Sequence, residues 1–151
     1  MTDAKFTRSI WPFFNCRSLF SENTLLTALM GGADWSWRVT GITAKALEML
    51  ASVDFKNVKG IRRAHLVDRI DTARAVFHTS SPLTEDEFFA TFWENDKTVI
   101  ATISENKMGG TLSRIIPIDY RLGLFAGKAI SFQYLKREAS FLRDLHAKSQ
   151  S

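Results

Sequence analysis

Apolar residues recur at helical spacing in four segments of the chain, each with a plausible start signal or apolar face. Ser21 and Thr43 precede two of these segments, and both residue types cap helix N-termini. Thr84 and Glu87 lie three residues apart, which is the spacing of a capping box. The pattern therefore predicts helices over residues 22–30, 44–52, 84–96 and 131–147. In the last two helices the apolar faces place Phe88, Phe92, Leu135 and Leu142 in the core.

Other segments are β-branched or alternate between apolar and polar residues, which favours strands. They are Trp35–Val39, Thr98–Ile103 and Leu112–Ile118. The short Glu105–Gly110 connection predicts that the last two strands pair as an antiparallel hairpin. The segment 61–77 fits either a strand followed by a helix or one long helix. We expect an α+β protein of one domain, residues 1–151, with helices packed on a small antiparallel sheet.

Length and composition exclude several classes of protein. The chain has 151 residues, 45% of them hydrophobic and 24% charged, which is ordinary for a globular domain and excludes collagen-like and low-complexity chains. Its one cysteine, Cys16, rules out an internal disulfide and a thiolate zinc cluster, and is expected to be a small buried residue. We recognise neither a signal peptide nor a membrane helix, and expect a soluble, cytoplasmic protein without membrane partners.

The formal net charge is +4, but the charges are unevenly spread. Residues 56–74 hold six cations against two acids, whereas residues 84–96 hold five acids and no cation. A basic cluster is what binding to nucleic-acid phosphates requires, so DNA or RNA is an expected partner. The competing interpretation is an ordinary solvated face. The residues expected to bind nucleic acid are Lys59, Arg62, Arg63 and Arg69.

One histidine in this basic segment has a carboxylate close to it in sequence. The segment Ala64-His65-Leu66-Val67-Asp68-Arg69 resembles the histidine motif of the HNH, or ββα-metal, nucleases, with Asp68 where proline is common. The resemblance covers residues 61–110. It implies that His65 is the general base that activates water, and that Asn95 orients its loop. It also implies that Asp68 or Asn106 helps to hold one divalent cation, Mg²⁺ or Zn²⁺.

The sequence therefore leaves functions of different classes open. The first is a metal-dependent nuclease acting on DNA or RNA, for which His65 must lie near Asp68, Asn95 or Asn106. The second is a non-enzymatic binding or regulatory protein of the small cassette or phage type, with nucleic acid as a partner or forming a homodimer through aromatics such as Trp35 and Trp37. The third is a small-molecule-binding domain lined by phenylalanine and tryptophan.

Overall fold

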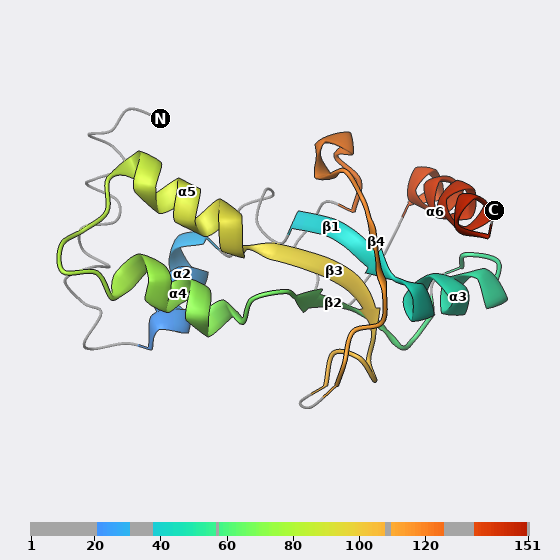
Figure 1. Ribbon diagram of the computed structural model, residues 1–151, viewed down its shortest axis with the longest axis horizontal. Helices are drawn as coiled ribbons and strands as arrows, with labels where there is room; N and C mark the ends of the chain where they lie inside the picture. The colour runs from blue at the N-terminus through green and yellow to red at the C-terminus, as the bar shows by residue number, and fades with distance from the viewer. Residues whose placement is uncertain (1–20, 31–37, 57, 108–109, 126–134, 151) are drawn as a thin grey trace. The chain divides into compact units, whose positions relative to one another are not determined.

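The computed structural model describes residues 21–30, 38–56, 58–107, 110–125 and 135–150 (Figure 1). The α carbons cluster into two compact units. Unit 1 comprises residues 1–36 and 65–97, and unit 2 comprises residues 37–64 and 98–151. Helices and a four-stranded sheet are both present, which confirms the α+β class. That residues 1–151 form one domain stays a prediction.

The described residues of unit 1 form the helices α2 (Glu22–Met30), α4 (Arg69–Phe77) and α5 (Glu85–Asn95). Each of α2 and α5 begins where the sequence predicts. The Ser21 hydroxyl accepts from the backbone N–H of Thr24 at 3.3 Å. At α5, Thr84 Oγ1 accepts from the Glu87 backbone while the Glu87 carboxylate accepts from the Thr84 backbone, which completes the expected capping box. The ambiguous segment 61–77 is a strand followed by a helix.

The core of unit 1 lies among these helices, with α4 beside both α2 and α5 (Figure 1). Phe88 and Phe92 are buried on α5, as predicted, and their rings stack at 6.4 Å between centroids. Other buried members of this cluster are Leu25, Leu26, Met30, Ala73, Val76 and Phe77. Burial of the apolar stripe of α5 explains why its phenylalanines recur at one turn of helix.

The sheet has the strand order β2 (Ile61–His65), β3 (Lys97–Thr102), β1 (Arg38–Thr43) and β4 (Ile115–Pro117). β1 and β4 run antiparallel, with Thr43 opposite Ile115. β2 and β3 are also antiparallel, because backbone hydrogen bonds join Gly60 to Ile103 at one end and Leu66 to Lys97 at the other. The central pair, β3 and β1, is parallel, so the sheet is mixed.

The prediction that residues 98–103 and 112–118 form neighbouring strands is wrong, because β1 lies between β3 and β4. The second strand is also shorter than predicted and covers only Ile115–Pro117. The physical reason lies in the connection. Glu105 accepts hydrogen bonds from Thr43 on β1 and from Ser113 just before β4. The connection is therefore folded around this carboxylate and carries the chain past β1 instead of turning back on β3.

Two helices of unit 2, α3 (Ala44–Ser52) and α6 (Lys136–Ser149), pack against each other (Figure 1). Thr43 caps α3 as predicted, its hydroxyl accepting from the backbone of Ala46 at 3.2 Å. Leu142 on α6 is buried, also as predicted. The core that they share contains Val39, Ile42, Leu47, Leu50, Ile61, Ile100, Ile118 and Phe125.

The prediction that Leu135 lies in the core is wrong, because its side chain is 69% exposed. The described part of α6 begins at Lys136, so Leu135 is at the position that precedes the helix. There its backbone N–H donates to the carboxylate of Glu138, which is buried. The backbone of Leu135 is thus held in place while its side chain is left outside the apolar face that carries Leu142.

Some predictions fall wholly or partly outside the described residues. They concern Cys16, Trp35, Trp37 and the part of the predicted last helix before residue 135. The strand predicted over Trp35–Val39 is described only from Arg38, where β1 begins. Within the ranges that the structure describes, no helix is long and apolar enough to cross a lipid bilayer.

Candidate functional site

His65, the predicted general base, lies in a cluster of three ionisable side chains within unit 1. It is the last residue of β2, Arg69 is the first residue of α4, and Asp96 directly follows α5. His65 Nε2 and Arg69 Nη1 each lie 3.9 Å from Asp96 Oδ1, and the Asp96 side chain is only 2% exposed. The backbone bond from Leu66 N–H to the Lys97 carbonyl, at 3.0 Å, holds the two segments together.

The electrostatics of this cluster favour a neutral imidazole. Burial lowers the pKa of His65 to about 4, and the positive charge of Arg69 adds to this effect, while Asp68 acts in the opposite direction. Burial also lowers the pKa of Arg69, against the opposing effect of Asp96. A neutral histidine beside a carboxylate has the protonation state that a general base requires. The same arrangement also occurs where a buried carboxylate only joins elements of the fold.

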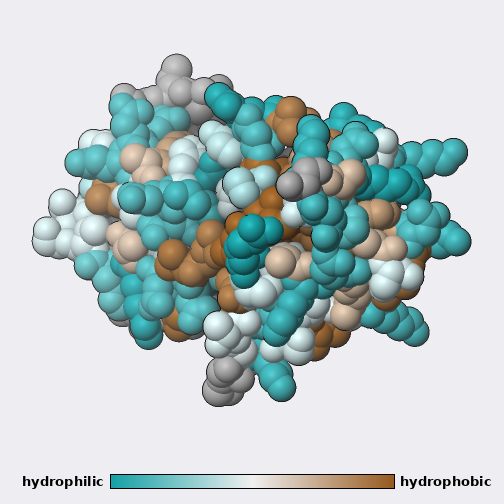
Figure 2. Space-filling view, turned by 45° about the vertical axis from the view of Figure 1, so that its right-hand side comes forward, coloured by the Kyte–Doolittle hydropathy of each residue, from teal (hydrophilic) through white to brown (hydrophobic). Residues whose placement is uncertain are grey.

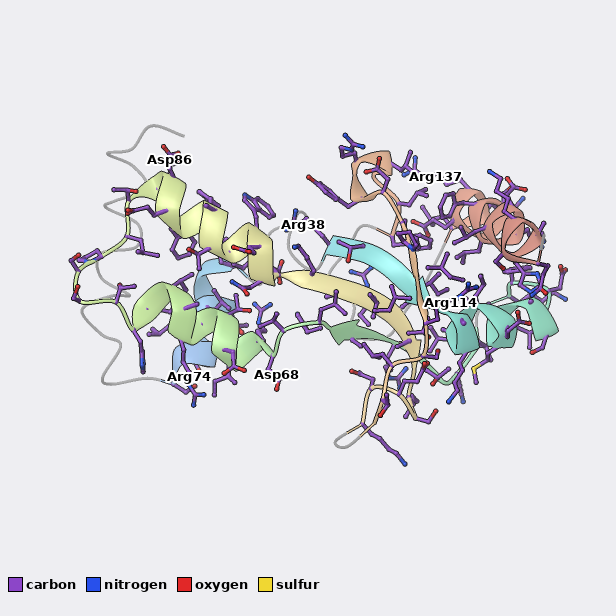
Figure 3. The ribbon with its side chains drawn as sticks, in the orientation of Figure 1. Arg38, Asp68, Arg74, Asp86, Arg114 and Arg137 are labelled. Carbon is purple, nitrogen blue, oxygen red and sulfur yellow. The ribbon has the colours of Figure 1, made fainter. Side chains whose placement is uncertain are left out.

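Of the other residues that the nuclease resemblance implies, Asp68 acts on His65 through its charge, whereas Asn95 and Asn106 donate to backbone carbonyls elsewhere. The Asn95 side-chain amide donates to the Thr91 carbonyl one turn earlier in α5, at 2.8 Å. Asp68 is exposed and precedes α4, where its side chain makes no capping hydrogen bond (Figure 3). Asn106 belongs to unit 2, and its amide donates to the Arg63 carbonyl at 3.4 Å.

The structure brings Asp96 to His65, and sequence reasoning missed Asp96 as a partner. The local sequence could not have identified it, because its position depends on α5 ending beside the end of β2. Within the described ranges, no group of three or more histidine, cysteine, aspartate or glutamate side chains is placed to hold a metal ion. The nuclease activity and the Mg²⁺ or Zn²⁺ cofactor therefore stay predictions.

The four cations predicted to bind nucleic acid differ in their exposure. Lys59 is exposed, and Arg62 is partly buried, with its guanidinium donating to the carbonyl of Ile61. Arg63 is 7% exposed and donates to the Phe125 carbonyl, near the charge of Glu138. Arg69 is 11% exposed beside Asp96. Arg63 and Arg69 thus make contacts inside their own units, and Lys59 is the exposed member of the set.

A second group of cations, all of them exposed, lies where four strand ends of unit 2 meet. β1 and β3 end there, and β2 and β4 begin there. The Ile103 backbone N–H donates a hydrogen bond to the Gly60 carbonyl, and Thr43 is paired with Ile115. At least one exposed cation lies within five residues of each of these strand ends, and the four that we consider have no ion-pair partner among the described residues. In the order of the strands β2, β3, β1 and β4 they are Lys59, Lys107, Lys45 and Arg114. We refer to these four residues as the basic end of the sheet.

The geometry of the strands sets the extent of the basic end. Neighbouring strands lie about 4.8 Å apart, so four strand ends span about 14 Å. Lys45 and Arg114 come from segments joined by two hydrogen bonds. The Ala44 backbone N–H donates to the Arg114 carbonyl at 2.8 Å, and the Lys45 backbone N–H donates to Ser113 Oγ at 3.2 Å. Figure 3 labels Arg114 close to the start of α3.

The basic end also contains an acid, but its charge is enclosed. Among described residues 43–45, 59–61, 102–107 and 113–115, Glu105 is the only aspartate or glutamate, and it is 4% exposed. Its two oxygens accept hydrogen bonds from the hydroxyls of Thr43, Thr102 and Ser113 and from two backbone N–H groups. The carboxylate is thus used within the fold, whereas the side chains of Lys45, Lys59, Lys107 and Arg114 are exposed.

Charge is also divided between the two units. Unit 2 has 14 lysines and arginines against six acids, a formal charge of +8, whereas unit 1 has six against ten, a charge of −4. Two of the six acids of unit 2, Glu105 and Glu138, are buried. The modest net charge of the whole chain therefore conceals one strongly basic unit.

No protein-family model, curated protein or solved structure matches this chain.

Proposed function

We propose that this protein binds nucleic acid, and that the basic end of the sheet contacts the phosphate backbone. The observation that carries the proposal is the placement of Lys45, Lys59, Lys107 and Arg114, which four separate segments of the chain bring to one end of one sheet. Lysine and arginine side chains without internal partners are available to neutralise phosphates and release counterions. The charge of +8 on this unit adds a long-range attraction for any polyanion.

The proposal is a binding function and includes no catalytic step. It keeps Lys59 from the residues expected on sequence grounds and adds three that lie outside the segment 56–74. Arg63 is not part of the proposed contact, because its guanidinium is bonded to the Phe125 carbonyl. Replacing Arg63 with an acid would therefore test the integrity of the fold and not nucleic-acid binding.

The test compares two charge-reversed variants by fluorescence anisotropy with labelled oligonucleotides of DNA and RNA. One is Lys45→Glu/Arg114→Glu, at the basic end. The matched control is Arg74→Glu/Lys148→Glu, which changes the net charge equally at two exposed positions on α4 and α6. We expect the first variant to lose at least tenfold in affinity and the control to keep most of it. Circular dichroism checks that both variants are folded.

The salt dependence gives a second measurement. If four cations neutralise four phosphates, log K should fall with log salt concentration with a slope of about −3 to −4. The Lys45→Glu/Arg114→Glu variant should reduce this slope by about half. The proposal is wrong if the wild-type protein binds no oligonucleotide at low salt, or if the two variants lose affinity equally.

A further inference from the structure

Tyr120 is an aromatic side chain that the fold leaves half exposed, at 50%, although it is held on a short, well-defined turn. It is the first residue of the 3-10 helix η1 (Tyr120–Leu122), which begins two residues after the end of β4. Asp119 caps this turn by accepting from the backbone N–H of Arg121 at 3.0 Å. Gly123 ends the turn with a left-handed φ of 61°, a conformation that glycine adopts without strain.

The ring of Tyr120 also has a cation against it. The guanidinium carbon of Arg38, the first residue of β1, lies 4.9 Å from the ring centroid. This contact orients the ring and lowers the conformational entropy that the Tyr120 side chain would lose when a ligand stacks against it. Isolated exposed apolar residues are common on protein surfaces, and Figure 2 shows hydrophobic residues between hydrophilic ones. An exposed aromatic ring that an arginine holds in place is a stronger sign of a binding site than such an isolated residue.

Tyr120 and the basic end lie toward opposite ends of β1 and β4. The backbone N–H of Ile118 bonds to the Thr40 carbonyl, so the chain passes back along β1 before it reaches Tyr120, whereas Arg114 precedes β4 at the end of β1 (Figure 3). Tyr120 is six positions after Arg114, and at about 3.3 Å per residue this distance is at most about 20 Å. β4 is one of the two edge strands of the sheet, and the residues Ile115 and Pro117 on it are exposed.

We infer that the nucleic acid bound by this protein is single-stranded, and that it runs along β4 with its phosphates at the basic end and a base stacked on Tyr120. This inference rests on the proposed function. In a duplex the faces of the bases are covered by their neighbours, whereas an unpaired base offers its face to an aromatic ring. Stacking accepts every base, so the contact adds affinity for single strands without reading a sequence.

The experiment measures the affinity of the wild-type protein and of Tyr120→Ala for a labelled single strand of about 12 nucleotides and for the matching duplex. We expect the wild-type protein to prefer the single strand, and Tyr120→Ala to lose about tenfold in affinity for it. Tyr120→Phe and Tyr120→Trp should keep the affinity, because stacking needs the ring and not the hydroxyl. Leu122→Ala is the matched control, since Leu122 is 51% exposed in the same turn.

The outcomes separate this inference from the proposed function. If Tyr120→Ala binds the single strand as the wild type does, while Lys45→Glu/Arg114→Glu loses binding, the stacking contact is refuted and the phosphate contact stands. A wild-type protein that binds the duplex more tightly than the single strand also overturns the inference. If the wild type binds neither oligonucleotide at low salt, both the proposed function and the inference fail.

Discussion

Glu105 and Ser113 are joined by two hydrogen bonds, in which Glu105 Oε1 accepts from the Ser113 backbone at 2.8 Å and from its hydroxyl at 2.6 Å. The other carboxylate oxygen accepts from Thr43 and Thr102, at the ends of β1 and β3. One buried carboxylate thus connects two strand ends to the segment before β4. It fixes the connection that carries Arg114, a member of the basic end.

We predict that Glu105→Gln lowers the free energy of unfolding by about 2–3 kcal/mol at pH 7, because hydrogen bonds to a charged group are lost and an amide N–H faces donors. Urea denaturation measures the change. The control is Glu94→Gln, on the exposed face of α5. An equal loss in both variants would show that the enclosed carboxylate is not the cause.

The same residue makes stability depend on pH. Burial by itself would raise the pKa of Glu105, but the hydrogen bonds from Ser113, Thr102 and Thr43 outweigh it and lower the pKa from its ordinary value of 4.5 to about 2. The contribution of Glu105 is therefore complete above about pH 4.5 and is lost as the pH falls toward 2. We expect denaturation curves of Glu105→Gln to lack this part of the acid destabilisation. If the stability of Glu105→Gln falls with pH in parallel with that of the wild type, the prediction is wrong.

His65 should destabilise the folded state in a different pH range. Burial, and to a smaller extent the charge of Arg69, lowers its pKa from the ordinary value of 6.5 to about 4. Between these values the unfolded chain binds the proton more readily, so stability falls as the pH drops from 6.5 to 4, by as much as about 3 kcal/mol. His65→Gln should remove this loss. NMR titration checks the pKa directly, with the resonance assigned by its absence from the variant, and a titration midpoint near 6.5 would refute the prediction.

Gly41 permits β4 to lie close against β1. A Cβ atom at this position would be 2.6 Å from Ile115 Cγ2 and 3.0 Å from the Ile116 carbonyl oxygen. We expect Gly41→Ala to lower stability by about 1–3 kcal/mol through overpacking. Because Ile115→Ala removes the closer atom, the double variant should be more stable than the sum of the single changes predicts. Strict additivity in this double-mutant cycle would exclude the steric explanation.

Leu135 and Leu142 provide a matched comparison near one helix. Leu142 is fully buried, so Leu142→Ala should cost about 2–5 kcal/mol through lost burial and the cavity left behind. Leu135 is largely exposed, so Leu135→Ala should change stability by less than about 0.5 kcal/mol. Chemical denaturation measures both changes. A large loss in Leu135→Ala would indicate that its side chain is covered in solution, by another copy or by a ligand.

The sequence by itself determined the features that depend on near neighbours. Thr84 and Glu87 form the predicted capping box, Thr43 caps α3, and the apolar stripe of α5 buries Phe88 and Phe92. These outcomes follow from interactions between residues three or four positions apart, which local spacing specifies. The α+β class followed from the same local patterns.

Tertiary structure decided the relationships between distant segments. The insertion of β1 between β3 and β4 could not be read from residues 98–118, because the strand that intervenes comes from residues 38–43. For the same reason the sequence did not show that Lys45, Lys107 and Arg114 join Lys59 at the basic end, or that Asp96 lies beside His65 in addition to the nearby charge of Asp68. Charge density along a chain reflects which residues are close in sequence. The basic end instead depends on which residues are close in space, and in this protein the order of the strands brings them together.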